Sequence, residues 1–242
     1  MKKIRGRNKW ELYLALKKAK QVRPYLVFTK RWNRNNFQSM LSKYKQIVIK
    51  PNDGLQARNI YFVTKSKKKI VVQVYRKKRY FSTSDLVYEF MGKRIGKRPY
   101  IIQKRINLAK IHKRPFDVRV IIQRKTFRSP WVATAYKVRV AGAGRKVTNA
   151  SKGGSVFTFI EAMQGSSFPD YMHEDLLRKL KQVSIRSAES LNSYYPKKRI
   201  YGIDIGVKED GSLHIFEINR NPSFKGFSPR QSRRMKRFKQ KK

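Results

Sequence analysis

Short apolar runs bounded by polar residues predict strands through the first half of the chain. These runs lie at 46–50, 59–63, 70–75 and 100–106, and the lysine-rich stretch 65–69 reads as an exposed turn. Residues 1–44 instead read as helical and basic, with Trp10, Leu12, Leu14 and Leu16 before Arg23-Pro24 and a second helix near 36–44. Ser84 is placed to cap a further helix over 85–94.

The second half of the chain continues with longer strands. Apolar runs predict strands at 117–124 and 131–140, followed by a glycine-rich segment at 141–154. A stripe of apolar residues spaced three and four apart predicts a helix over 174–192. A hairpin follows, with strands at 202–207 and 212–219 joined by an Asp-Gly turn.

Strands and helices mix without strict alternation, which predicts the α+β class with largely antiparallel sheets. The chain has 242 residues, of which 40% are hydrophobic and 12% aromatic, a composition typical of a folded protein. We expect a basic helical segment at 1–44, a small lobe at 45–107, a large lobe at 108–227 and a basic disordered tail at 228–242.

The predicted hairpin carries two carboxylates and an asparagine at positions that share its period of two. Acids are scarce, with 14 Asp and Glu against 60 Lys and Arg. Asp204, Glu217 and Asn219 offer oxygen ligands, which suit a hard cation such as magnesium better than zinc. The spacing alone leaves a second reading open, in which these side chains are solvated on the surface of a hairpin.

The metal interpretation depends on the register of the hairpin. If Val207 pairs with Ser212, then Asp204 lies opposite Ile215 and diagonal to Glu217, so the ligands share a face. A slip of one residue would place the two carboxylates on opposite faces.

The net charge of +46 is the second strong feature of the chain. Such a charge attracts polyanions, and binding of this kind weakens steeply as salt rises. Eight of the fifteen residues from Lys65 to Arg79 are basic, as are nine residues of the acid-free segment Lys225 to Lys242. We therefore expect electrostatic contact with an anionic polymer or acidic partner, the alternative being solvated faces and tails. Aromatic residues do not interleave with these runs, so any nucleic-acid binding would be non-specific.

Other features exclude several classes of protein. The chain has no cysteine, which excludes disulfides, cysteine-bound zinc and thiol nucleophiles. No apolar run is long enough to predict a membrane span. The first twenty residues lack a cleavage-like site and read as a mature cytosolic N-terminus.

Several basic residues stand where they can contact phosphate groups. Lys50 ends a strand and precedes a loop at 52–59, which contains Gly54 and can present backbone N–H groups. Lys152 combines a cation with the flexible backbone of Gly153 and Gly154.

Asp117 and Arg119 are two apart in a strand and therefore share a face. They read either as an internal ion pair or as an arginine that the aspartate orients toward an anionic ligand. Arg139 follows in the next strand, and Asn149 lies ten residues further on.

The order of these motifs resembles the ATP-grasp superfamily, and more narrowly the YheC/YheD-type ATP-grasp proteins associated with the endospore coat. The resemblance covers about residues 20–225 and is carried by KPNDG at 50–54, RPFDVRV at 114–120, TNASKGGS at 148–155, GIDI at 202–205 and FEINRNP at 216–222. It implies a nucleotide enclosed by two α+β lobes with largely antiparallel sheets.

The resemblance also implies roles for individual residues. Lys50 and Gly54 would contact the ATP phosphates. The strand holding Gln103, Lys104 and Ile106 would present its backbone to adenine, with the Gln103 side chain at the base edge.

In the other lobe, Arg119, Arg139 and Asn149 would face the γ-phosphate or an acyl-phosphate derived from it. The loop containing Lys152, Gly153 and Gly154 would also contact the nucleotide. The metal set Asp204, Glu217 and Asn219 would hold one or two magnesium ions.

The function implied by this resemblance is that of an ATP- and magnesium-dependent carboxylate-amine ligase acting through an acyl-phosphate. The alternative is a non-catalytic basic protein of the coat that keeps the ATP-grasp fold and binds a polyanion. We expect a cytoplasmic protein, with association with the spore coat implied by the resemblance. The carboxylate and amine substrates are not predicted by the sequence.

Overall fold

The computed structural model describes residues 4–54, 58–146, 148 and 153–239, and its chain divides into two compact units. The smaller unit is formed by Arg5–Tyr13 and Val27–Ile106, and the larger unit mainly by Leu14–Leu26 and Asn107–Lys242. The division after Ile106 lies one residue from the predicted lobe boundary. No division falls at residue 44, because 27–44 belongs to the smaller unit.

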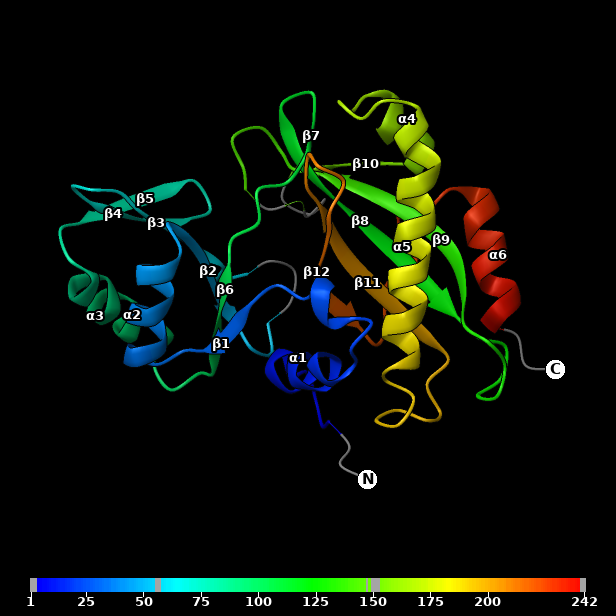
Figure 1. Ribbon diagram of the computed structural model, residues 1–242, viewed down its shortest axis with the longest axis horizontal. Helices are drawn as coiled ribbons and strands as arrows, with labels where there is room; N and C mark the ends of the chain where they lie inside the picture. Colours follow the sequence, from blue (N-terminus) through cyan, green and yellow to red (C-terminus); the bar gives the residue numbers. More distant parts are fainter. Residues whose placement is uncertain (1–3, 55–57, 147, 149–152, 240–242) are drawn as a thin grey trace. The chain divides into compact units, whose positions relative to one another are not determined.

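The smaller unit contains a six-stranded antiparallel sheet in the order β1-β6-β2-β3-β4-β5 (Figure 1). Helices α2 and α3 pack their buried residues against its core, including Phe37, Met40, Val87 and Met91. Its elements are β1 (Thr29–Arg31), α2 (Arg34–Lys43), β2 (Gln46–Pro51), β3 (Tyr61–Lys65), β4 (Ile70–Val74), β5 (Lys77–Phe81), α3 (Ser84–Ile95) and β6 (Tyr100–Lys104). Helix α1 (Lys9–Lys18) contributes residues to both units, and η1 (Arg23–Tyr25) belongs to the larger one.

Three details of the smaller unit differ from the sequence prediction. Strand β3 begins at Tyr61 rather than 59, because Asn59 has a left-handed φ of 55° that a strand does not accommodate. The cap of α3 is Thr83, whose side chain accepts a hydrogen bond from the Leu86 N–H, and Ser84 is already helical. Strands β1 and β5 were not predicted, since the first is short and the second is almost entirely exposed.

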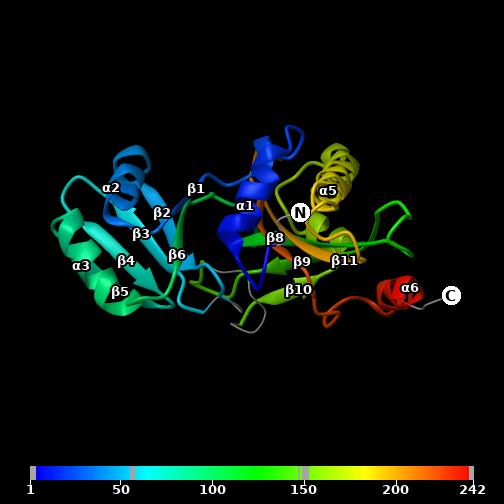
Figure 2. The ribbon, with the colours of Figure 1, turned by 90° about the horizontal axis from the view of Figure 1, so that it is seen from below.

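The larger unit contains an antiparallel sheet in the order β10-β9-β8-β11-β12, with β7 paired to β8. Its helix α5 contacts β8, β9 and β11, and Figure 2 shows α5 along one face of these strands and α6 on their other side. The elements are β7 (Lys110–Ile111), β8 (Arg114–Gln123), β9 (Val132–Val140), β10 (Ser155–Phe157), α4 (Phe159–Gln164), α5 (Tyr171–Glu189), β11 (Ile200–Val207), β12 (Leu213–Asn219) and α6 (Pro229–Lys239). The predicted α+β class with antiparallel sheets is therefore confirmed.

Helix α6 corrects the prediction of a disordered tail. Its Met235 is fully buried against Ile121 and Ala135. The side chains of Gln123 and Arg199 donate hydrogen bonds to carbonyl groups near its end. A single buried methionine among many cations left too weak an apolar stripe for the sequence to indicate a docked helix.

The register of the β11–β12 hairpin also differs from the prediction. Val207 pairs with Leu213 rather than Ser212, and a bulge follows between Asp204 and Ile205. The shifted register moves the partner of Asp204 by one residue, and the bulge in β12 moves it by one more, so that Asp204 lies directly opposite Glu217 instead of opposite Ile215. The two carboxylates are thus closer neighbours than the regular pairing would make them.

Candidate functional site

Four neighbouring strands of the larger sheet place a row of charged residues across one of its faces. Lys137 on β9 lies opposite Arg119 on β8, which lies opposite Asp204 on β11, which lies opposite Glu217 on β12. On one side of this row, Arg139 on β9 lies opposite Asp117 on β8. On the other side, Asn219 on β12 lies opposite Gly202 on β11. We call this set the charged face: Asp117, Arg119, Lys137, Arg139, Asp204, Glu217 and Asn219.

Asp204 is at the centre of the charged face and receives several hydrogen-bond donors. Arg119 donates from Nε to Oδ1 at 2.6 Å and from Nη2 to Oδ2 at 2.7 Å. Arg139 Nη2 lies 3.1 Å from Oδ2, and the Asn219 amide nitrogen lies 3.5 Å from the same oxygen. Both carboxylate oxygens are therefore engaged by protein groups.

Asp117 is bound in a similar way by a single arginine. Arg139 donates from Nε and from Nη2, each at 2.7 Å, to its two oxygens, and the Thr148 hydroxyl donates to Oδ2 at 2.5 Å. Asp117 and Arg119 thus pair across strands and not with each other. Arg139 contacts both aspartates and joins the two pairs into one network.

The two buried aspartates have pKa values shifted in opposite directions. Burial alone would raise the pKa of Asp204, but the charges and hydrogen bonds of Arg139 and Arg119 lower it to about 2. Burial raises the pKa of Asp117, and its contacts with Arg139 and Thr148 oppose this only in part. Asp204 is therefore firmly ionised, as a metal ligand must be.

Lys137 belongs to the charged face but was not among the predicted site residues. Its Nζ donates to the Lys225 carbonyl at 2.6 Å and lies 4.4 Å from the centre of the Phe227 ring. Burial lowers its pKa to about 8, and the nearby Arg119 and Arg139 add to the effect. Its position two residues before Arg139 in a strand was a signal that could have revealed it. Thr148 had no comparable signal.

Glycines on either side of Asp204 explain the GIDIG pattern of β11. A Cβ at Gly202 would lie 2.6 Å from Cβ of Pro222, and a Cβ at Gly206 would collide with the Phe216 ring. Glycine is required at both positions because these side chains approach the strand so closely. Positions 202, 204 and 206 of β11 lie on the charged face, and of these three only Asp204 carries a side chain.

The residues predicted to contact the nucleotide from the smaller unit lie on β2, β6 and the loop after β2. The Gln103 side chain is buried and donates to the Thr29 hydroxyl at 2.9 Å, so its amide nitrogen is engaged within the unit. Lys104 is exposed, and its ammonium lies 5.4 Å from the centre of the Tyr44 ring. Ile106 follows the end of β6 and is half-buried.

Lys50 immediately precedes a tight turn of the smaller unit that runs from Pro51 to Gly54. Lys50 is half-buried near the end of β2. The Gly54 carbonyl accepts a hydrogen bond from Lys9 Nζ at 2.6 Å, and its N–H donates to the Pro51 carbonyl. A Cβ at Gly54 would lie 2.9 Å from Pro51, which accounts for glycine here.

Two of the predicted phosphate contacts, Asn149 and Lys152, lie outside the described residues. Gly153 has a φ of +78° and open space around the position of a Cβ. Gly154 is half-buried and immediately precedes β10. The left-handed backbone at Gly153 favours glycine for its conformation and not for packing.

The charged face suits a hard cation in its chemistry. Asp204, Glu217 and Asn219 together offer carboxylate and amide oxygens, which magnesium prefers. Within the described part of the chain, no group of three or more His, Cys, Asp or Glu could hold a metal ion. A magnesium site here therefore needs the Asn219 oxygen or a ligand from elsewhere, and the arginines must release oxygen atoms of Asp204.

The chain belongs to the YheC/D-like ATP-grasp family, whose sequence model matches residues 3–241. It is 24% identical over 229 residues to the endospore coat-associated protein YheD of Bacillus subtilis (strain 168). That alignment covers 91% of this chain and 49% of YheD, so the chain spans about half the length of this relative.

Solved structures with the same fold agree with this assignment. The VanG D-Ala:D-Ser ligase of Enterococcus faecalis matches with a TM-score of 0.58 and 11% identity, over 96% of this chain and 60% of that one. The ATP-grasp ligase PsnB, solved with a precursor variant, Mg and ADP, matches with a TM-score of 0.52 and 14% identity, over 93% and 53%. The fold is that of ATP-grasp proteins, as predicted.

No helix in the described part of the chain is both long enough and apolar enough to cross a membrane.

Proposed function

We propose that this protein is an ATP- and magnesium-dependent ligase that joins a carboxylate to an amine. The charged face carries this proposal, because it combines an ionised aspartate, a second carboxylate and two arginines on four adjacent strands. Membership of the ATP-grasp family supports nucleotide binding. The presence of Mg and ADP in the PsnB complex supports the same ligands here.

The proposed reaction has two steps. A carboxylate oxygen of the first substrate attacks the γ-phosphorus of ATP, the bond to the β-phosphate oxygen breaks, and an acyl-phosphate and ADP form. The amine nitrogen of the second substrate then attacks the acyl carbon, phosphate leaves, and the nitrogen loses a proton. Neither step needs a nucleophile from the protein, so positioning and charge neutralisation carry the catalysis.

Residues of the charged face have two roles in this proposal. Asp204, Glu217 and Asn219 would hold magnesium, which would supply charge neutralisation at the phosphates. Arg119 and Arg139 stabilise the transferred phosphoryl group, because their fork of N–H donors matches phosphate oxygens. Asn149 is proposed to assist them.

The remaining predicted residues are proposed to bind the nucleotide itself. Lys50 and Gly54 contact phosphates, as does the loop of Lys152, Gly153 and Gly154. The backbone at Gln103, Lys104 and Ile106 contacts adenine. The Gln103 amide nitrogen already donates to Thr29, so its carbonyl oxygen is the atom proposed for the exocyclic amine of the base.

Calorimetric titration with Mg-ATP tests the proposal. We expect binding by the unchanged protein and at least a tenfold loss for Glu217→Gln. Glu209→Gln is the matched control, since it removes the same charge from the exposed turn of the same hairpin. Absence of Mg-ATP binding by the unchanged protein, or equal effects of the two substitutions, would refute the proposed site. Release of ADP and phosphate against a panel of carboxylates and amines then identifies the substrates.

A second candidate function is electrostatic binding of an anionic polymer or acidic partner at the coat of endospores. The name of YheD supports the location, and the net charge of +46 supports the binding. Expression in the cytoplasm before assembly into the coat is part of this proposal. Binding that is indifferent to salt concentration would exclude it.

A further inference from the structure

Helix α6 presents a dense set of cations to solvent. Five of its residues are basic and exposed, and we call them the outer face of α6: Arg230, Arg233, Arg234, Lys236 and Arg237. The sequence contains no acid after Glu217. Among the described residues, none of these five cations forms an ion pair with a carboxylate.

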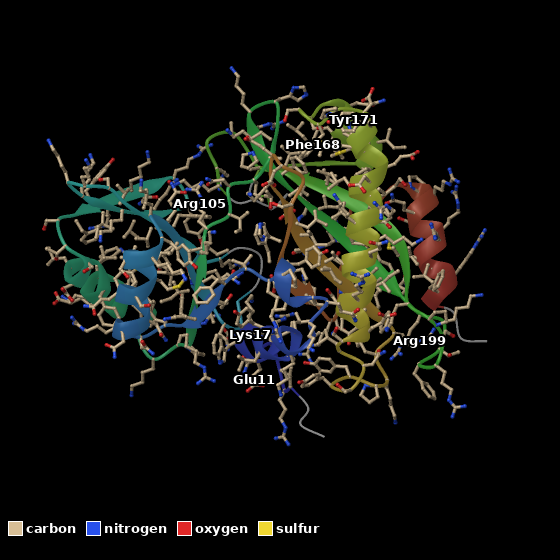
Figure 3. The ribbon with its side chains drawn as sticks, viewed as in Figure 1. Glu11, Lys17, Arg105, Phe168, Tyr171 and Arg199 are labelled. Carbon is tan, nitrogen blue, oxygen red and sulfur yellow. The ribbon has the colours of Figure 1, made fainter. Side chains whose placement is uncertain are left out.

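The helix is held firmly on the larger sheet while its cations point outward. Met235 is fully buried against Ile121 and Ala135. Gln123 Nε2 donates to the Met235 carbonyl at 3.1 Å, and Arg199, labelled in Figure 3, donates from Nη2 to the Phe238 carbonyl at 2.9 Å. The cations are therefore displayed on a preformed helix, so that a partner does not have to order the backbone first.

The spacing of the arginines places them in one stripe. Arg230, Arg233, Arg234 and Arg237 follow the i, i+3, i+4, i+7 pattern and cover two turns, about 10 Å of helix axis. Duplex DNA carries a negative charge about every 1.7 Å along its axis, so a stripe of this length meets several phosphates. Arginine binds phosphate through a fork of donors, whereas lysine acts as a point charge.

The outer face of α6 includes no exposed aromatic residue. Single-stranded nucleic acid is usually bound by stacking of bases on aromatic side chains, which this face cannot provide. The phosphate backbone of a double-stranded nucleic acid can be bound by cations alone, without base stacking. We propose that the outer face of α6 binds the phosphate backbone of double-stranded nucleic acid without sequence preference. The proposed binding of duplex nucleic acid does not depend on the ligase proposal. It assigns the binding of a polyanion to one surface and one class of partner.

The test compares two variants that lose the same charge from different surfaces. The first is Arg230→Gln/Arg233→Gln/Arg234→Gln/Arg237→Gln in α6. The second is Lys65→Gln/Lys67→Gln/Lys68→Gln/Lys69→Gln, at the exposed end of β3 and in the turn that follows it. Fluorescence anisotropy with a labelled duplex DNA of about 20 base pairs measures affinity between about 50 and 200 mM salt.

We expect the α6 variant to bind at least tenfold more weakly and to lose about three to four units of the log–log salt slope, since each phosphate contact contributes about 0.9. The turn variant should lose less than threefold. Equal losses in both variants would mean that net charge alone drives binding, and would overturn the proposal. Tighter binding of single-stranded DNA, or of polyglutamate at equal charge, would overturn it in favour of another polyanion.

Two measurements keep this outcome separate from that of the proposed function. Mg-ATP binding should be unchanged in both variants, because neither alters the residues assigned to the nucleotide. Unchanged urea unfolding midpoints would establish that both variants are folded, since all substituted side chains are exposed. Failure of Mg-ATP binding in the unchanged protein would leave the duplex result intact.

Discussion

Two clusters of arginine in the larger unit are built in opposite ways. On the charged face, Arg119 and Arg139 are mostly buried and each contacts a carboxylate within 2.7 Å. On the outer face of α6, four arginines are exposed, and among the described residues they have no carboxylate partner.

The difference follows from the cost of removing a charge from water. A buried guanidinium needs a partner because desolvation costs several kcal/mol, whereas an exposed one keeps its hydration. Pairing also fixes the orientation of a side chain, so the charged face can recognise a ligand of defined geometry. Exposed arginines create a positive electrostatic potential that attracts any polyphosphate, without requiring a defined geometry.

The largest expected effect is on folding. Arg139→Met leaves Asp117 buried with only the Thr148 hydroxyl as a described hydrogen-bond donor and removes one partner of Asp204. Breaking one side of a buried ion pair typically costs about 3–5 kcal/mol, and we expect a loss of this size in the free energy of unfolding. Urea titration followed by circular dichroism measures it.

The comparison is with Arg234→Met on the outer face of α6. Because that side chain is exposed, we expect a change within about 0.5 kcal/mol. Asp117→Asn/Arg139→Met should recover part of the loss, since it removes the unpaired charge. If Arg234→Met destabilised the protein as much as Arg139→Met, the contrast between the two clusters would be wrong.

The next largest effect is on ligand binding: one substitution should strengthen metal binding and weaken nucleotide binding. Arg119 engages both oxygens of Asp204, so Arg119→Gln frees ligand atoms and removes a repelling cation. We expect Mn²⁺, used as a probe for Mg²⁺, to bind about tenfold more tightly without nucleotide, a change of about 1.4 kcal/mol. ATP should bind about tenfold more weakly, because a phosphate contact is lost. Electron paramagnetic resonance and calorimetry measure the two affinities.

Arg128→Gln serves as the control, since it removes the same charge from the exposed loop between β8 and β9. It should leave both affinities within twofold of the unchanged protein. A parallel loss of metal and nucleotide binding in Arg119→Gln would argue that the arginine supports the site only structurally.

The sequence predicted part of this arrangement because strand periodicity is local. Asp204, Glu217 and Asn219 were placed on one face, and this holds although the shifted register and the bulge together changed the pairing of Asp204 with Glu217 from diagonal to direct. The partners of Asp117 and Arg119 could not be predicted, because they come from β9 and β11, and strand order depends on contacts distant in sequence. The sequence analysis considered an ion pair between Asp117 and Arg119, or an arginine that Asp117 orients toward a ligand. Neither interpretation included the partners Arg139 and Asp204.

The same limit explains two features of the larger unit that the sequence analysis did not predict. Helix α6 docks through Met235 and through side chains of Gln123 and Arg199, which lie far from it along the chain. The spacing of Lys137 from Arg139 places both on one face of a strand, but the position of Lys137 opposite Arg119 depends on the pairing of β8 with β9. The alternation of side chains along each strand predicted which residues share a face. The order of the strands in the sheet determined which of those residues are in contact.

The smallest expected effect tests whether Lys137 behaves as a buried cation, unlike those of α6. Burial lowers its pKa from 10.5 to about 8, so between these values the unfolded chain binds more protons than the folded one. Stability therefore rises with pH across this window. The difference in unfolding free energy between the unchanged protein and Lys137→Met should rise by about 1 kcal/mol from pH 7 to 10, after allowance for solvent screening. Lys181→Met, on the exposed side of α5, should show no such rise in urea titrations, and an equal rise would place Lys137 among the solvated cations.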